Sequence, residues 1–166
     1  MRRDRMVVVG LVVGAALAAA EPVVAQEPDW GRRSWGTLHI GPSFIAGWDE
    51  TGLVEFGGGG EWVWPDGLGF SVDFSLLAAA GDFVPGALLI SPAIIYEFPT
   101  RGKLRPFVRG GVSLVNFYFP MADLGGGVNY WVTERVGVKG ELRHHLFFEE
   151  PDTGITSLRA GVNLRF

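Results

Sequence analysis

The sequence predicts an all-β fold, an eight-stranded antiparallel up-and-down transmembrane β-barrel. Three observations indicate this fold. Beyond the first 25 residues, apolar and polar residues alternate with a period of two, as in strands that have two different faces. Seven turn-forming segments divide this alternating pattern into eight parts. No apolar run in the same part of the chain approaches the ~20 residues that a transmembrane helix needs.

The first 25 of the 166 residues have the pattern of a secretory signal peptide. A basic start that contains Arg2, Arg3 and Arg5 precedes an uncharged apolar run over 6–20, which is too short to span a bilayer. We expect cleavage after Ala25. The remaining 141 residues then form a short lead over 26–33 and one barrel domain over 34–166.

The composition excludes several classes of protein. A formal net charge of −4 without a basic block disfavours nucleic acid as a partner. The chain has no cysteine, which excludes disulfides, thiolate metal sites and thiol nucleophiles. A hydrophobic content of 48% and an aromatic content of 13% exclude a disordered chain.

Turn residues place the strands. The breaks are rich in Gly, Pro, Asp and Thr and lie near 48–52, 65–67, 81–86, 99–102, 119–122, 133–135 and 149–154. The expected strands are therefore 34–45, 53–64, 68–78, 87–98, 105–117, 123–133, 136–147 and 155–166. Each unit of strand and turn has about 18 residues, enough for the ~9–11 residues with which a tilted strand crosses a bilayer.

Alternation is clearest in five of these strands. In chain order their apolar members are Val54, Phe56, Trp62 and Trp64; Leu68, Phe70, Val72, Phe74 and Leu76; Leu124, Val128, Tyr130 and Val132; Val136, Val138 and Leu142; and Leu158, Ala160, Val162, Leu164 and Phe166.

The polar face indicates which side is turned outward. A soluble barrel exposes a polar face rich in Lys and Glu, whereas a membrane barrel turns its apolar face to lipid and its polar face to the lumen. After Ala25 the chain contains only two lysines, Lys103 and Lys139, and its polar face consists largely of Gly and Ser. Small side chains suit the narrow lumen of eight strands. We therefore expect the apolar face to contact lipid.

Charged residues on the polar face balance, five acidic against five basic. They are Glu55, Glu61, Asp73, Glu97 and Glu141 with Arg109, Lys139, Arg143, Arg159 and Arg165. Confined charges must be paired, because isolated burial is unfavourable. We predict a structural ion-pair network in the lumen, centred on Glu141, Arg143, Arg109 and Arg159, that plugs the barrel.

The C-terminal residues carry a resemblance. Arg159, Gly161, Leu164 and Phe166 form a pattern that resembles the C-terminal signal recognised by the barrel-assembly machinery. The segments 105–111 and 124–143 are similar to the outer-membrane protein β-barrel domain family, whose members include the OmpA membrane domain and OmpX-type small barrels. The resemblance covers about 34–166.

This resemblance implies an outer-membrane location in a Gram-negative-type envelope, with both ends of the mature chain in the periplasm. It implies outer-membrane lipids, lipopolysaccharide and the barrel-assembly machinery as partners. We expect a monomer with no nucleic-acid partner and no cofactor. The expected role is that of a closed structural or interaction protein, with no catalytic residue and no metal site assigned.

Three alternatives stay open. Lipid A deacylases carry a His-x-Ser-Asn run, but His145 is followed by Leu146 and Phe147, so a lipid A-modifying enzyme would need Ser157 together with Glu149 or Glu150. A narrow gated pore could use the same charges. A periplasmic lipid carrier would need an apolar cavity. For His39, His144 and His145 we expect hydrogen-bonding roles in the lumen or at its rim.

Overall fold

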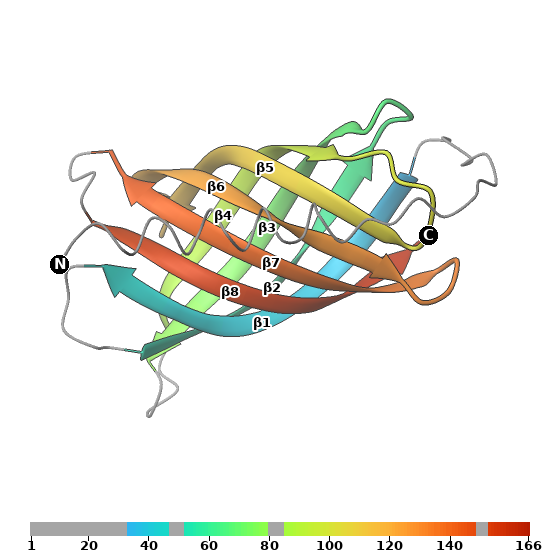
Figure 1. Cartoon of the computed structure of the whole chain (residues 1–166). Helices are drawn as coiled ribbons and strands as arrows, with labels where there is room; N and C mark the ends of the chain where they lie inside the picture. The colour runs from blue at the N-terminus through green and yellow to red at the C-terminus, as the bar shows by residue number, and fades with distance from the viewer. Residues whose placement is uncertain (1–32, 47–51, 80–84, 149–152) are drawn as a thin grey trace, which may run out of the picture.

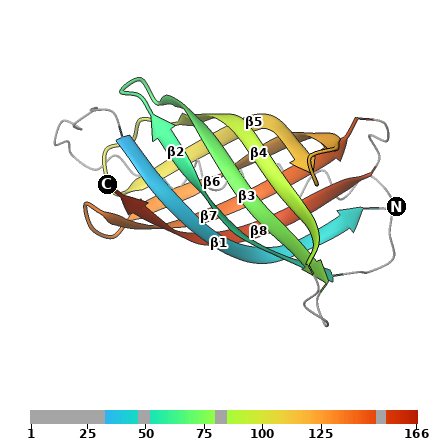
Figure 2. The ribbon, with the colours of Figure 1, turned by 180° about the vertical axis from the view of Figure 1, so that it is seen from behind.

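The chain forms a closed barrel in which each strand pairs antiparallel with the next and the last pairs with the first (Figures 1 and 2). The computed structural model describes residues 33–46, 52–79, 85–148 and 153–166. The strands are β1 (Arg33–Ala46), β2 (Gly52–Val63), β3 (Leu68–Ala79), β4 (Pro85–Glu97), β5 (Leu104–Val115), β6 (Phe119–Trp131), β7 (Val136–Phe147) and β8 (Gly154–Arg165). This confirms the predicted eight-stranded up-and-down barrel.

The expected signal peptide over 1–25 lies outside the described residues, as does most of the lead over 26–33. Within the described ranges, no helix is long and apolar enough to cross a membrane.

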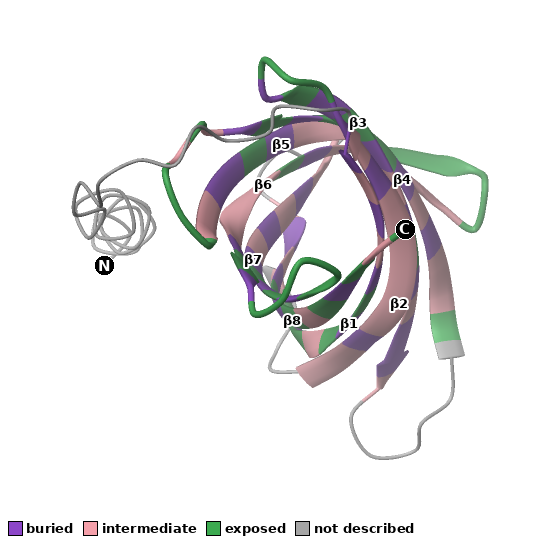
Figure 3. Ribbon diagram, turned by 90° about the vertical axis from the view of Figure 1, so that its right-hand side faces the viewer, coloured by how far each residue is buried: buried purple, intermediate pink, exposed green. Residues whose placement is uncertain are grey.

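The two ends of the barrel differ. The turn end carries the start of β1, the end of β8 and the short connections over 64–67, 98–103 and 132–135. It lies at the right of Figure 1 and faces the viewer in Figure 3. The opposite end, called the loop end, carries the other four connections. Because small membrane barrels have short turns on the periplasmic side, we expect the turn end to face the periplasm.

One connection lies earlier in the chain than the sequence predicts. We expected a break at 119–122, but β6 begins at Phe119 and the chain reverses over 116–118. Pro120 is opposite Leu114 of β5 but has no partner on β7, because β7 begins to pair with β6 only at Met121. Proline is tolerated at such a position, where no partner strand requires its missing N–H. Pro120 therefore belongs to β6 and not to the turn that the sequence pattern predicted around it.

The observed reversal is a tight turn at two residues with positive φ. Asn116 has φ 49° and Phe117 has φ 67°, a conformation that glycine or asparagine adopts more readily than phenylalanine. The turn is fixed to β4 by two hydrogen bonds: Asn116 N–H donates to the Leu88 carbonyl at 2.8 Å, and Leu88 N–H donates to Asn116 Oδ1 at 2.9 Å. A neighbouring strand thus holds the hairpin in place.

The apolar face is turned outward, as the composition of the polar face predicted. Leu38 on β1 is 67% exposed and Ile94 on β4 is 64% exposed. Other exposed apolar side chains on this face are Ile40, Phe44, Phe70, Phe74, Val108, Val112, Val138, Leu158, Val162 and Leu164. An apolar outer surface on a closed sheet matches the hydrocarbon core of a bilayer, since closure leaves no free edge strand in lipid.

The lumen also contains apolar side chains that the alternation pattern did not reveal. A turn-end apolar layer consists of Trp35, Val63, Ile95, Phe107 and Trp131. A loop-end apolar layer consists of Leu77, Leu89, Met121 and Ile155. The small and polar residues expected on the inward face are therefore interrupted by an apolar layer near each end of the barrel. Most of the buried charges lie between these two layers.

The close approach of β1 and β8 explains why residue 41 is a glycine. The pairing of β1 with β8 is interrupted at Gly41 and Pro42, and Pro42 has no N–H to donate. A Cβ atom on Gly41 would lie 1.8 Å from the Leu158 carbonyl oxygen, a distance no side chain can adopt. Gly140 on β7 differs, because a Cβ there would meet nothing within 4 Å.

Replacing these two glycines should have unequal effects. Gly41→Ala forces β1 away from β8, and we expect it to lower the free energy of unfolding by about 1–3 kcal/mol, the usual range for overpacking. Gly140→Ala is the matched control. Urea unfolding of the refolded proteins in lipid vesicles, followed by tryptophan fluorescence, measures both. Equal stabilities of the two variants would contradict the close approach.

Candidate functional site

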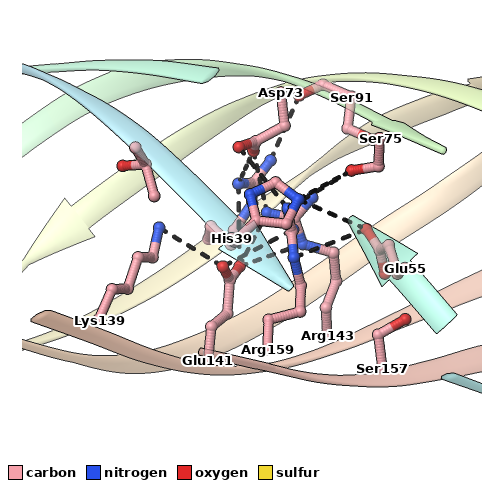
Figure 4. Close-up of polar contacts among 12 residues, drawn as sticks. His39, Glu55, Asp73, Ser75, Ser91, Lys139, Glu141, Arg143, Ser157 and Arg159 are labelled. Carbon is pink, nitrogen blue, oxygen red and sulfur yellow. Dashed lines mark hydrogen bonds and ion pairs between the residues drawn. The ribbon is translucent and has the colours of Figure 1, made fainter. Parts of the chain in front are cut away.

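The centre of the lumen holds a cluster of buried charges between the two apolar layers (Figure 4). We call this cluster the charge network. It comes from β2, β3, β5, β6, β7 and β8 and consists of Glu55, Glu61, Asp73, Arg109, Asp123, Lys139, Glu141, Arg143 and Arg159. Its members are buried, and their side chains come from opposite walls of the barrel. Contacts across the lumen are therefore possible.

Arg143 donates two short hydrogen bonds within the network. Its Nη2 donates to Glu141 Oε1 and to Asp73 Oδ2, each at 2.9 Å. Arg109 also donates to Asp73, and its Nη2 donates to Asp123 Oδ2 at 3.2 Å. These two arginines from β5 and β7 therefore share the carboxylate of Asp73 on β3. Charge-assisted hydrogen bonds of this kind link walls of the barrel that are not neighbours in the sheet.

Arg159 joins the network by longer contacts. Its Nη1 lies 3.7 Å from Glu141 Oε2, and its Nε lies 3.6 Å from Glu55 Oε1. Its Nη2 also contacts the ring of His39, which in turn lies 3.1 Å from the Ser75 hydroxyl. Arg159 thus connects the network to the polar residues of β1 and β3.

Lys139 and Glu61 form the edge of the network nearest the turn end. Their side chains pair across the lumen, and Lys139 Nζ also lies 3.4 Å from Glu141 Oε2. The same Nζ lies 4.5 Å from the centre of the Phe107 ring, which belongs to the turn-end apolar layer. The charge network and the turn-end apolar layer are therefore in direct contact.

Two of the ten predicted lumen charges do not join the network. Glu97 lies beyond the turn-end apolar layer, where its Oε1 is 2.7 Å from Arg33 Nη1 and 3.3 Å from Arg105 Nη1. Arg165 lies over the ring of Trp131, 3.9 Å from its centre. Both residues lie nearer the turn end than the network does, and the turn-end apolar layer lies between them and the network.

Sequence reasoning missed Asp123. This residue is completely buried and pairs with Arg109 and Arg143. It shares the inward face of β6 with Gly125 and Gly127, so the alternation contained the signal. The misplaced turn put Asp123 at the very start of its strand, although β6 in fact extends four residues further.

Hydroxyl and imidazole groups cover the loop-end side of the network. Ser43 and Ser157 are hydrogen-bonded at 2.7 Å, and Ser91 and Ser113 at 2.6 Å. His145 Nδ1 lies 3.0 Å from the Ser113 hydroxyl. These bonds partner polar groups that would otherwise be buried alone.

Ser157 and the histidines near it take part in separate hydrogen bonds. Ser157 is hydrogen-bonded to Ser43 inside the lumen, where His145 is hydrogen-bonded to Ser113. His144 is on the outer face, with its Nδ1 2.8 Å from the Thr156 hydroxyl. Glu149 and Glu150 lie outside the described residues. Among the described residues, no group of three His, Asp or Glu side chains is arranged to hold a metal ion.

The residues of the expected assembly signal occupy different environments. Arg159 belongs to the charge network, and Gly161 faces the lumen next to His39. Leu164 and Phe166 are exposed on the outer surface at the turn end.

The fold and its apolar outer surface define a transmembrane β-barrel of the small outer-membrane type. The comparison with solved structures gives the same class. Neisserial surface protein A is 18% identical with a TM-score of 0.61, over 82% of this chain and 97% of that chain. The N-terminal β-barrel domain of Pseudomonas aeruginosa OprF is 23% identical with a TM-score of 0.59, over 80% of this chain and 97% of that chain.

A third neighbour is Ail, the attachment invasion locus protein of Yersinia pestis, solved in complex with the heparin analogue sucrose octasulfate. It is 11% identical with a TM-score of 0.59, over 82% of this chain and 99% of that chain. No protein-family model and no curated protein matches the sequence. The chain therefore has the fold of eight-stranded outer-membrane barrels, and at these identities the likeness establishes the fold alone.

Glu141 should be important for stability, since it contacts four cations: Arg109, Lys139, Arg143 and Arg159. Glu141→Ala leaves these buried cations short of a partner, and we expect a loss of about 3–5 kcal/mol in the free energy of unfolding. Urea titration with the heat-dependent gel shift as readout measures the loss. Glu134→Ala, at an exposed turn glutamate, is the control. A variant as stable as the wild type would contradict an energetic role for the network.

Proposed function

We propose that this protein is a closed barrel of the outer membrane with a structural or interaction role, and that the charge network plugs its lumen. The single observation that carries the proposal is the position of this network, fully buried between two apolar layers. An eight-stranded barrel has an interior that side chains just fill. An ion that entered from either end would therefore meet an apolar layer first.

The apolar layers favour a plug over a gated pore. A gate made of ion pairs alone could open when one pair exchanges partners. Here Trp35 and Trp131 pack edge to face, with their ring centres 5.5 Å apart, across the turn-end side of the network. Apolar constrictions oppose the passage of water and ions. Conduction would require both layers and the network to rearrange together.

The polar centre also disfavours a lipid carrier, which would need a continuous apolar cavity. In the described part of the lumen the two apolar layers are separated by charged and hydroxyl-bearing side chains. A structural or interaction role on the outer surface or at the exposed ends remains the function that this arrangement supports best.

Planar-bilayer recording tests the plug. We expect the purified wild-type barrel to give no discrete conductance steps, because the layers and the network leave no water-filled path. The OprF N-terminal domain, measured in parallel, provides a barrel of the same fold for comparison. Reproducible unit steps from the wild-type protein would overturn the proposal and favour the gated pore.

Export to the outer membrane is part of the same proposal, supported by the basic start and apolar run of residues 1–25. We expect the protein to fractionate with outer membranes and its intact mass to correspond to a chain that begins at Gln26. Blocking cleavage with Ala25→Arg should leave the longer chain in the inner-membrane fraction. Recovery of wild-type protein in the soluble periplasm, or with Met1 retained, would contradict this route.

A further inference from the structure

A cavity opens at the turn end, outside the turn-end apolar layer and separate from the charge network. Its volume is about 320 Å³, and it lies between the β4–β5 and β6–β7 connections beside the end of β8. Its lining includes Lys103, Arg105, Trp131, Val132, Glu134 and Arg165. Figure 3 views the barrel from this end. No member of the charge network lines this cavity.

The charges around the cavity do not balance. Three cations line it, together with one carboxylate, that of Glu134. Arg105 has a second acidic neighbour in Glu97, but Glu97 is shared with Arg33. Across the described turn end, the cations Arg33, Arg101, Lys103, Arg105, Arg135 and Arg165 face the side-chain carboxylates of Asp66, Glu97 and Glu134. The cavity is therefore a cationic site in an otherwise acidic protein.

Hydrogen-bond donors in the cavity wall lack partners. The Nε atoms of Arg105 and Arg165 and the indole N–H of Trp131 are buried, and none has a hydrogen-bond partner among the described residues. Trp131 itself is only 5% exposed. Buried donors without an acceptor are uncommon in folded proteins. The excess positive charge around the cavity, with unpartnered donors on three of its lining residues, favours a ligand that is both an acceptor and an anion.

We propose that this cavity binds the phosphate group of a phosphate ester. Arg105 and Arg165 would supply forked donors, and Lys103 a mobile point charge at the mouth, where its Nζ reaches the Val132 carbonyl at 3.2 Å. Trp131 and Val132 form an apolar wall beside these donors. Such a wall suits the carbon skeleton that carries the phosphate.

Two sources could present this group at the turn end. One is the headgroup of an anionic phospholipid, because the exposed aromatic residues Trp64, Tyr96 and Phe166 place the same end at a membrane interface. The other is a soluble phosphate ester of the periplasm. The chemistry recognised is the same, and the experiment separates the two.

Binding is measured by native mass spectrometry of the full barrel released from nonionic detergent. The probes are phosphatidylglycerol, phosphatidylcholine and glycerol 3-phosphate. The test variant is the double substitution Lys103→Gln with Arg165→Gln. The matched control is Arg101→Gln with Arg135→Gln, which removes the same charge from the turn end but at residues that do not line the cavity. The heat-dependent gel shift verifies that each variant is folded.

We expect the test variant to bind the phosphate probe at least about tenfold more weakly, because the loss of even one of its two charge-assisted hydrogen bonds has that effect. The control should stay within about twofold of the wild type, as expected for screened surface charges. Retention of phosphatidylglycerol over phosphatidylcholine, without binding of glycerol 3-phosphate, assigns the site to a lipid headgroup. Binding of glycerol 3-phosphate assigns it to soluble esters.

Two results would overturn the proposal: no phosphate probe bound by the wild type, or equal weakening by the test and control variants, which would indicate attraction by net charge alone. If the double variant fails to fold, Lys103→Gln alone replaces it, since this exposed side chain makes one hydrogen bond to the neighbouring turn. Bilayer conductance is independent of this site, so failure here leaves the plug intact.

Discussion

Closure of an eight-stranded sheet is the constraint on which the rest of this structure depends. Closure gives each strand two neighbours and leaves an interior with space for side chains only. Inward charged residues can then reach partners on strands that are not their neighbours in the sheet. For Asp73 these partners are Arg109 and Arg143, which come from β5 and β7. The charge network is thus a consequence of closure, since its ion pairs join different strands except for the contacts of Glu141 with Lys139 and Arg143 on β7.

The interior is layered along the barrel axis rather than uniformly polar. Ionic pairing is strongest where water is excluded, and the two apolar layers exclude it from the network. The same layers divide the protein into regions with separate roles. The network links opposite walls of the lumen, whereas the cationic cavity beyond Trp131 faces the medium at the turn end. Neither the charge network nor the loop-end apolar layer contributes a residue to the lining of that cavity.

Much of the fold was predictable because strands have a simple period. Inward and outward positions follow from counting by two, so Glu141, Arg143 and Arg159 were placed on the lumen face from sequence alone. The errors had local causes. Pro120 was interpreted as a turn residue although it lies in β6, and this error concealed Asp123. Trp35 and Phe107 have the inward parity of His39 and Arg109, but they were not recognised as lumen residues because the lumen face was expected to be small and polar.

The sequence by itself determined the fold class, the number of strands and the membrane-facing surface, since each depends on local periodicity and composition. The tertiary structure alone decided which charges meet. Arg109 and Asp73 are separated by 36 residues, and their contact depends on the stagger of strands in the closed sheet. It also decided that Glu97 and Arg165 lie apart from the network, beyond the layer of Trp35 and Trp131. The stagger between paired strands sets the height of each residue along the barrel axis. The alternation within a single strand does not contain that information.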